Sequence, residues 1–294
     1  AAGYQTSMGL MAGLAVVMFL FCFFTTTERL EHEVEEKPFR EQLSLLLKND
    51  QWLILCGVCV LGTTGYVVRG SVALYYAKYY LGGDAGLQSM FLSTGVGAAI
   101  LAMVASTWIT KRYCKVKLFR FSQMAVGVLS LLMYFAVGPN DIALAFILFF
   151  LISFVVDLHA PIFWSAIAEV VDYRESKTGK RVAGLAFGGI SFCQKAGMGV
   201  AGALVGWLLA YFEYEASAQQ SEFTLMGIVL MLTIIPGAFH YLVGWLMNRY
   251  KITDEEYKSL SAVVQANRKA AIVSGDVQLD ATAQQTADMA SGVK

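Results

Sequence analysis

Five ionisable side chains stand inside long apolar stretches of this 294-residue sequence. They are Arg69, Asp157, His159, Lys195 and His240. A charge at the centre of a bilayer costs about 2.5 to 3.5 kcal/mol even on a lenient insertion scale. Such residues persist when they are paired or hydrated, and by default they mark a route for substrate or ions. These positions are therefore the first candidates for a functional site.

Three of these residues are predicted to lie at similar depth. With a rise of about 1.5 Å per residue, Arg69 lies about 18 Å from the outer end of its helix, and Asp157 and Lys195 each lie about 24 Å from theirs. We expect Lys195 to pair with Asp157, and Arg69 to reach the same cavity. A purely structural salt bridge between helices is the alternative. His240 is expected to form a hydrogen-bonded contact between helices.

Aromatic side chains near these charges are typical of a sugar site, because flat rings stack on sugar rings while charged groups bind the hydroxyls. The aromatic candidates are Tyr66, Tyr75, Tyr76, Trp164 and Phe192, of which Trp164 is the one we favour. Most aromatic residues of membrane proteins serve only in the core or at the interfaces. The residues that we predict to bind substrate are Lys195, Arg69, Asp157, Trp164, Tyr66 and Gln194.

The elements that must position these residues are membrane-spanning helices. Hydrophobic residues make up 57% of the sequence, and a span needs about 20 apolar residues. Seven stretches qualify: residues 4–26, 52–80, 86–110, 118–137, 141–170, 183–212 and 223–248. Several are too long for one straight crossing, and we expect them to tilt or to extend into the headgroups. The sequence thus predicts an all-α membrane protein.

The distribution of Lys and Arg predicts the orientation of the spans. These residues gather in the loops within 27–51, 111–120 and 174–181, whereas the turns near Gly82, Pro139 and Glu215 have none. Cytoplasmic loops are enriched in Lys and Arg. We therefore expect a cytoplasmic C-terminus and place residue 1 outside. Because the chain starts outside without a signal peptide, we expect an odd number of spans upstream and regard the sequence as a fragment.

Four segments follow from this reading: a transmembrane helix over 1–26, a cytoplasmic loop with an amphipathic helix over 27–51, a six-helix bundle over 52–250, and a tail over 251–294. The tail is predicted to be helical from Thr253 to about Lys269, where Thr253 and Glu256 have the spacing of a capping box, and disordered beyond Val273. We expect the acidic residues of 28–36 to form a solvated face. Cys56 and Cys59 are expected to pack as small apolar residues.

No motif of a soluble enzyme, paired zinc ligands or nucleic-acid-binding signal is found. We therefore predict no catalytic residues, no metal site in this fragment and no nucleic-acid partner.

The residues after the fifth span resemble the glycoside-pentoside-hexuronide:cation symporter family. The stretch from Trp164 through Glu169, Asp172 and Tyr173 is similar to the DxxDY segment of that family, with Glu in place of the first Asp. A KTGxR turn follows at residues 177–181, and then a helix that carries Lys195 before Gly197. The segments Tyr75-Tyr76-Ala-Lys-Tyr-Tyr-Leu-Gly and Gly3-Tyr4-Gln5 also resemble the family, so the likeness spans residues 1 to about 258.

This resemblance implies a major facilitator fold of two six-helix halves, of which the chain supplies the sixth helix and the second half. It implies symport of a sugar with Na⁺ or H⁺ by alternating access, with substrate between the halves near the midplane. The coupling cation is expected mainly in the missing first half, and no other cofactor is implied. Lys195 would line the central cavity. The predicted gate or hinge residues at the cytoplasmic face are Glu169, Asp172, Tyr173, Lys177, Thr178, Gly179 and Arg181.

The partners predicted in this way are a sugar, a lipid bilayer and the missing half of the same protein. The bilayer is expected to be a plasma membrane, in particular a bacterial inner membrane. Other readings remain open at this point. The same fold could carry a lysolipid or another solute. The chain could be a non-transporting sensor, or an enzyme that uses Asp157 and His159 as an acid-base pair. Residues two apart on a helix point about 200° from each other, which argues against that pair.

Overall fold

The computed structural model describes residues 2–26, 38–216 and 218–273. The predictions for the acidic stretch 28–36 and for disorder beyond Val273 lie outside the described residues. Helix α1 (Ala2–Thr25) belongs to a different compact unit from residues 38–270 and is described by itself. It carries no charged residue, and its length and composition suit a membrane span.

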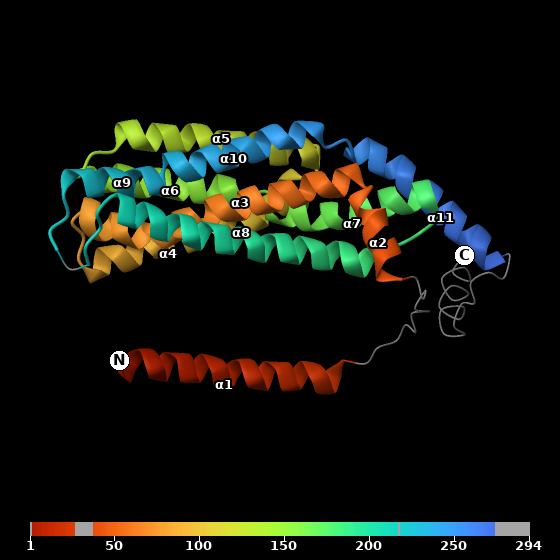
Figure 1. The fold of residues 1–294 in the computed structure, drawn as a ribbon, viewed down its shortest axis with the longest axis horizontal. Coiled ribbons are helices and arrows are strands. Elements are labelled where there is room, and N and C mark those ends of the chain that lie inside the picture. The colour runs from red at the N-terminus through yellow and green to blue at the C-terminus, as the bar shows by residue number, and fades with distance from the viewer. Residues whose placement is uncertain (1, 27–37, 217, 274–294) are drawn as a thin grey trace. The chain divides into compact units, whose positions relative to one another are not determined.

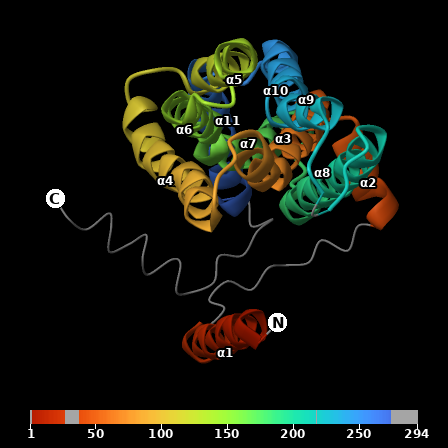
Figure 2. The same ribbon diagram turned by 90° about the vertical axis from the view of Figure 1, so that its left-hand side faces the viewer.

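The remaining described residues form a helical bundle. Its long helices are α3 (Asp50–Tyr75), α4 (Ala85–Ile109), α5 (Lys115–Ala136), α6 (Ile142–Asp157), α7 (Ala160–Thr178), α8 (Ala183–Tyr211), α9 (Glu222–Leu232) and α10 (Ile234–Leu246). Shorter or peripheral elements are α2 (Phe39–Leu47), η1 (Tyr76–Tyr80), η2 (Met247–Arg249) and α11 (Asp254–Val273). Viewed along the bundle, α4 and α6 pack on one side, α3 and α8 on the other, and α5 packs against α10 (Figure 2).

Seven helical segments of the described chain are long and apolar enough to cross a membrane, as the sequence predicts. The fifth and seventh of them, however, are not single tilted helices. The fifth breaks at Leu158 and His159, between α6 and α7, and the seventh breaks at Thr233, between α9 and α10. The sequence analysis did not predict these two breaks.

A proline follows each break. Pro161 stands in the first turn of α7 and Pro236 in the first turn of α10. Proline has no N–H, so the carbonyl four residues earlier loses its helical donor. The two carbonyls concerned are those of Asp157 and Leu232. In a lipid environment such groups need partners inside the protein.

Local capping explains where several helices begin. The side chain of Asn49 accepts a hydrogen bond from the backbone of Trp52 at 3.2 Å and donates to the carbonyl of Val170 at 2.9 Å. Asp84 and Ser221 cap α4 and α9 in the same way. Each cap satisfies one of the free N–H groups at a helix start. Asn49 in addition ties the start of α3 to α7.

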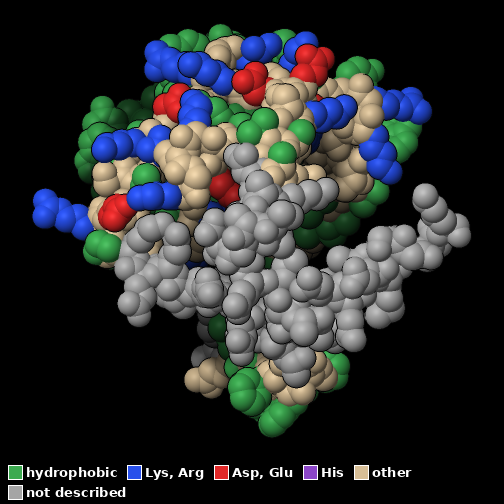
Figure 3. All heavy atoms as spheres, turned by 90° about the vertical axis from the view of Figure 1, so that its right-hand side faces the viewer, with side chains coloured by type: hydrophobic (Ala, Val, Ile, Leu, Met, Phe, Trp, Pro, Cys, Tyr) green, Lys and Arg blue, Asp and Glu red, His purple; other side chains and the backbone are tan. Residues whose placement is uncertain are grey.

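One end of the bundle is rich in charge. Helix α2, the end of α7 and helix α11 meet there (Figure 1), and Figure 3 shows Lys and Arg side chains gathered over this face with Asp and Glu among them. At the opposite end, the turns at Gly82, Pro139 and Glu215 lie between consecutive helices. We call the end where α2, α7 and α11 meet the charged end. The amphipathic helix predicted in 27–51 is α2, which buries Leu46.

Two apolar clusters fill the bundle, one near each end. In α3, residues up to Cys59 belong to one cluster and residues from Val68 onward to the other. The same division separates Phe119 from Val126 in α5, and Ile190 from Ala201 in α8. Between the clusters lies a layer of polar residues contributed by α3, α5, the α6–α7 break, α8 and α10. This polar layer contains the candidate site.

Close packing of α3 on α8 depends on glycine. A Cβ atom on Gly197 would lie 2.9 Å from the carbonyl oxygen of Val60 and 3.1 Å from Cβ of Thr63. We therefore expect Gly197→Ala to lower stability by about 1 to 3 kcal/mol through overpacking. The measurement is thermal unfolding of the purified chain in detergent.

The matched control is Gly202→Ala on the same helix. A Cβ atom there would meet nothing within 4 Å, and Ala is a better helix former than Gly by about 1 kcal/mol. It should leave the melting temperature unchanged or raise it. Equal effects of the two substitutions would contradict the packing argument.

Candidate functional site

Two neighbouring cavities lie in the polar layer. The first, which we call the tryptophan cavity, has a volume of about 250 Å³ and is bounded by α3, the α6–α7 break, α7, α8 and α10. Its polar and aromatic lining residues are Thr63, Tyr66, Asp157, His159, Phe163, Trp164, Gln194 and His240. The second, the arginine cavity, has a volume of about 340 Å³ between α3, α4 and α6, and its polar lining is Tyr66, Arg69, Ser153 and Asp157.

Tyr66 and Asp157 line both cavities and so form the wall between them. Tyr66 is 52% exposed and Trp164 is 46% exposed, so both rings present an open face. Asp157 is 9% exposed and ends α6 at the helix break. The structure thus brings together four of the six predicted substrate-binding residues in the tryptophan cavity: Tyr66, Asp157, Trp164 and Gln194. Arg69 joins two of them in the arginine cavity.

Arg69 is held by the broken seventh span. Its Nε donates to the carbonyl of Leu232 at 3.1 Å, and its Nη2 donates to the hydroxyl of Ser130 at 2.7 Å. Leu232 is the residue whose carbonyl loses its helical donor at Pro236, so Arg69 replaces that donor. The Nη1 atom is buried and has no hydrogen-bond partner among the described residues. Arg69 therefore has a structural role at the break and one donor left over near the cavity.

A glutamine links the α6–α7 break to α10. The side chain of Gln123 is fully buried in α5 and contacts Nδ1 of His240 at 2.8 Å, Nδ1 of His159 at 3.0 Å and the carbonyl of Val156 at 3.3 Å. His159 also hydrogen bonds to the carbonyl of Val156. The prediction that His240 makes a hydrogen-bonded helix contact is confirmed. The second nitrogen of His240, Nε2, is buried, and no atom in the described part of the chain forms a hydrogen bond with it.

Lys195 is not paired with Asp157 in the structure. It is exposed on α8, makes no ion pair within the described residues, and lines neither cavity. The predicted pair of Lys195 with Asp157 is therefore wrong for this structure. Lys195 and Asp157 were matched by their depth along their helices. The rotation of α8, however, turns Gln194, the neighbour of Lys195, toward the tryptophan cavity.

Three of the aromatic candidates also lie elsewhere. Tyr76 is buried against Tyr80 and Phe91, and Tyr75 packs on Tyr79 and Tyr214 near the end opposite the charged end. Phe192 is 73% exposed on α8. Sequence reasoning missed Gln123 and Thr63, because neutral polar residues inside a span give a weaker signal than charges. Within the described residues, no three His, Cys, Asp or Glu side chains are grouped to hold a metal ion.

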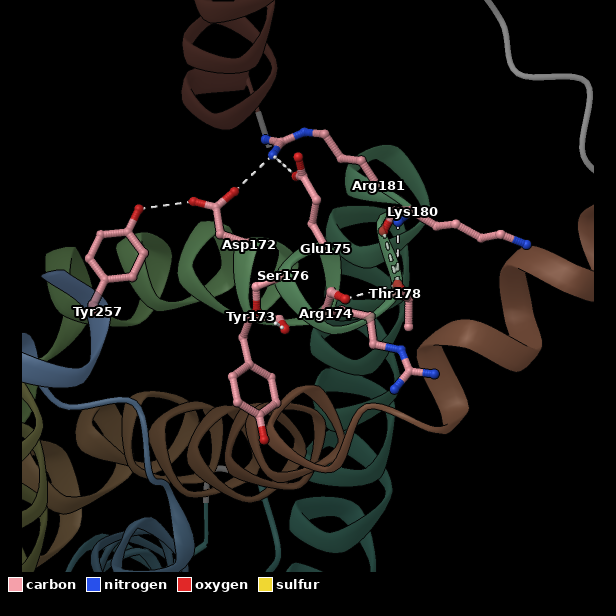
Figure 4. Close-up of polar contacts among 9 residues, drawn as sticks. All are labelled: Asp172, Tyr173, Arg174, Glu175, Ser176, Thr178, Lys180, Arg181 and Tyr257. Carbon is pink, nitrogen blue, oxygen red and sulfur yellow. Dashed lines mark hydrogen bonds and ion pairs between the residues drawn. The ribbon is translucent and has the colours of Figure 1, made fainter. Parts of the chain in front are cut away.

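The predicted gate residues do gather at the charged end, where α7 ends (Figure 4). Arg181 donates to Asp172 and to Glu175, each at 2.8 Å. Tyr257 of α11 donates to the other oxygen of Asp172 at 2.9 Å. Asp172 therefore joins α7 to the start of α8 and to α11.

The turn between α7 and α8 is formed by the predicted KTGxR residues. Gly179 has a left-handed conformation with φ of +66°, which glycine adopts without strain, and its N–H donates to the carbonyl of Glu175 at 2.7 Å. Thr178 accepts from the backbone of Lys180 at 3.3 Å. Lys177 hydrogen bonds to the hydroxyl of Tyr173. The motif is thus a helix stop that places Arg181 beside Asp172.

A second ion pair at this end involves the remaining gate residue, Glu169. Glu169 pairs with Lys115 at the start of α5, and Lys115 also lies 3.6 Å from Asp254 of α11. Lys180 pairs with Glu41 of α2 at 2.6 Å. The charged end therefore holds α2, α5, α7, α8 and α11 together through ion pairs rather than through apolar contacts alone.

Among the groups outside the spans, Tyr257 and Arg181 have pKa values shifted by burial and by their contacts with Asp172. Burial, followed by the hydrogen bond to Asp172, raises the pKa of Tyr257 to about 12. Burial alone lowers the pKa of the Arg181 guanidinium, but its hydrogen bonds to Glu175 and Asp172 outweigh burial and raise it. Both groups keep the protonated forms that donate to Asp172 at neutral pH.

The seven apolar helical segments of the described chain define a multi-pass membrane protein. The chain belongs to a family described as MFS/sugar transport protein, whose model matches residues 1–254. Membership of a transporter family confirms that the chain is not an enzyme. It also confirms the resemblance to glycoside-pentoside-hexuronide:cation symporters.

Individual relatives agree with this family. The chain is 32% identical over 270 residues to the inner membrane symporter YicJ of Escherichia coli K12, covering 91% of this chain and 58% of YicJ. It is 30% identical over 262 residues to the isoprimeverose transporter of Lactiplantibacillus pentosus, covering 87% of this chain and 53% of the relative. The chain thus spans little more than half the length of these relatives.

A solved structure shows the same fold. The crystal structure of FucP, a major facilitator superfamily transporter of Escherichia coli, in the outward conformation matches with a TM-score of 0.60 at 16% sequence identity. The match covers 84% of this chain and 55% of FucP. It supports the major facilitator fold that the sequence predicts.

The contact of Tyr257 with Asp172 predicts how α11 is attached. Tyr257→Phe removes one hydrogen bond to a carboxylate, which is worth about 1 kcal/mol at this partly exposed site. We expect faster hydrogen exchange in the first turns of α11, measured by mass spectrometry. In the wild type the same contact should be lost as pH rises from about 10 to 12, because a raised pKa stabilises the fold only while the phenol stays protonated.

The control for this substitution is Tyr113→Phe, which changes a tyrosine that is 67% exposed. Its exchange rates in α11 should equal those of the wild type. Unchanged exchange in Tyr257→Phe would mean that the hydrogen bond does not hold α11.

Proposed function

We propose that this chain forms the second half of a secondary active transporter that carries a sugar or glycoside together with a cation. The observation that carries the proposal is the tryptophan cavity. Tyr66 and Trp164 offer open aromatic faces, while Asp157 and Gln194 offer an acceptor and an amide in the same space. Aromatic stacking combined with a few polar groups suits a sugar ring, and the family is one of sugar transport proteins.

The proposal includes the rest of the transporter. Relatives that extend beyond this chain are named symporter or transporter, so residues outside the chain are proposed to complete the site and to hold the coupling Na⁺ or H⁺. The open faces of Tyr66 and Trp164 and the exposed position of Lys195 suit a site that is closed by another part of the protein. No observation favours a lysolipid or a sensor over this function.

The proposed orientation places the charged end in the cytoplasm, which would make the C-terminus cytoplasmic and residue 1 external in an inner membrane. Lys and Arg concentrate at this end, as the positive-inside rule requires. The ion pairs of Asp172 and Glu169 are proposed to hold the cytoplasmic side and to separate when it opens. Ion pairs that break and reform suit a device with two discrete states.

The stacking role of Trp164 leads to a binding test. We expect Trp164→Ala in the full-length protein to weaken sugar affinity by about tenfold or more, since stacking and apolar contact are both lost. Affinity is measured by calorimetry with a panel of mono- and disaccharides. Trp207→Ala is the control, because Trp207 is 65% exposed on α8 and lines neither cavity.

If both variants bind sugar as the wild type does, the tryptophan cavity is not the sugar site.

We also propose that Lys195, which is exposed on α8, faces the substrate route between this chain and the rest of the transporter, and this role leads to a transport test. We expect Lys195→Ala to abolish cation-coupled uptake in membrane vesicles without preventing insertion, because a membrane lysine that faces the substrate route would be lost. Lys117→Ala, at the charged end, should transport normally. Sugar accumulation at the wild-type level in Lys195→Ala would remove Lys195 from the site.

A further inference from the structure

The carboxylate of Asp157 is buried and makes no hydrogen bond or ion pair within the described residues. Asp157 is 9% exposed and lines both cavities. An ionised carboxylate without a partner is costly to bury, so most buried carboxylates are paired or bind a cation. At the Pro236 break, Arg69 supplies the missing donor. At the Pro161 break, no side chain of the described residues donates to Asp157.

Further oxygen atoms surround this carboxylate. Ser153 stands one helical turn before Asp157, so both face the arginine cavity, and its hydroxyl has no hydrogen-bond partner among the described residues. Tyr66 interacts electrostatically with Asp157 from α3 and lines the same cavity. The carbonyl of Asp157 itself lacks a helical donor because residue 161 is proline. Carboxylate, carbonyl and hydroxyl oxygens are the ligands that hard cations prefer.

The helix end adds to the negative potential. Asp157 is the last residue of α6, and the C-terminal end of a helix carries a partial negative charge. In transporters, the C-terminal ends of broken helices coordinate Na⁺ or H⁺ near the middle of the membrane. The neighbouring carbonyls of Val156 and Leu158 already accept from Gln123 and Ser106, which leaves the Asp157 end as the one with free acceptors.

The positive groups nearby do not neutralise Asp157 directly. Arg69 shares the arginine cavity, but its hydrogen bonds within the described residues go to Leu232 and Ser130. The titratable groups that share a cavity with Asp157 are Tyr66, Arg69 and Cys59 of α3, His159 at the break and His240 of α10. Both histidines are bonded to Gln123. Helix α4 contributes only apolar residues and glycine to the arginine cavity.

We propose that the Asp157 end of α6 is a binding site for a monovalent cation, Na⁺ or H⁺, with Ser153 and Tyr66 as further oxygen ligands. The site lies within this chain, apart from any cation site in the first half. That the cation drives sugar transport rests on the proposed function, whereas its binding does not. Arg69 then serves as the balancing charge across the cavity when the site is empty.

The test uses the 294-residue chain in lipid nanodiscs and two probes. Sodium chloride is titrated by calorimetry at constant ionic strength against choline chloride, and the protonated carboxyl band is followed by infrared difference spectroscopy between about pH 4 and pH 9. Sodium binding that is lost in Asp157→Asn identifies a Na⁺ site. A carboxyl band that titrates in the wild type and is absent in Asp157→Asn, without sodium binding, identifies a proton site.

The matched control is Asp141→Asn, which removes an exposed carboxylate just before the start of α6 and should change neither signal. Two further variants apply if Asp157→Asn does not fold. Ser153→Ala should weaken sodium binding by about tenfold, and Asp157→Glu should shift the carboxyl band. A wild type that neither binds sodium nor shows a titrating buried carboxyl overturns the proposal. Failure of the full-length protein to bind sugar contradicts the proposed function alone.

Discussion

Every polar backbone group in the middle of this bundle must be satisfied inside the protein, because lipid offers no hydrogen bonds. This requirement applies above all to the two broken spans, because the proline after each break leaves a carbonyl in the middle of the bundle without its helical donor. Side chains from other helices meet it at three carbonyls beside the breaks, of which only that of Leu232 is one freed by a proline. Ser106 of α4 donates to Leu158 at 2.7 Å, Gln123 of α5 donates to Val156, and Arg69 of α3 donates to Leu232. The breaks therefore fix which helices must lie beside each other.

The need to satisfy polar groups inside the protein also distinguishes structural from functional residues among the buried charges. Arg69 would be read as a pathway residue from its type and depth, yet its Nε donates to Leu232 of the seventh span and its Nη2 donates to Ser130 of α5. Asp157 sits at an equivalent break and receives no such partner from the described residues. A carboxylate cannot donate to a free carbonyl, so Asp157 does not stabilise its own break as Arg69 stabilises the other. The difference between these two residues is the strongest structural reason to treat Asp157 as functional.

The architecture could be predicted from the sequence because its signals are long and additive. Seven apolar stretches, the clustering of Lys and Arg in alternate loops, and the DxxDY and KTGxR patterns each extend over many residues. The gate residues were predicted together because the sequence itself holds them within 13 positions, from Glu169 to Arg181. Local motifs of this kind need no knowledge of how distant helices pack.

The pairing of residues across helices could not be predicted in the same way. Depth along the membrane follows from counting residues, but the rotation of a helix follows from its neighbours. Helix α8 has glycines on several faces, and the packing of Gly189 on Trp52 and of Gly197 on Val60 selects one of them. That choice turns Gln194 toward the cavity and Lys195 away from it. The breaks were missed for another reason: Pro161 and Pro236 are visible in the sequence, but hydropathy averages over them.

The two ends of the bundle are held by different forces, and this bears on how the proposed transporter would move. At the end opposite the charged end, Tyr75, Tyr79 and Tyr214 pack together, and Tyr76 stacks on Phe91. Such aromatic contacts lose their stabilisation when water enters. At the charged end, ion pairs such as Arg181 with Asp172 are partly exposed, and water and salt replace exposed pairs at small cost. Within this half, separation at the charged end therefore costs less free energy than separation at the aromatic end.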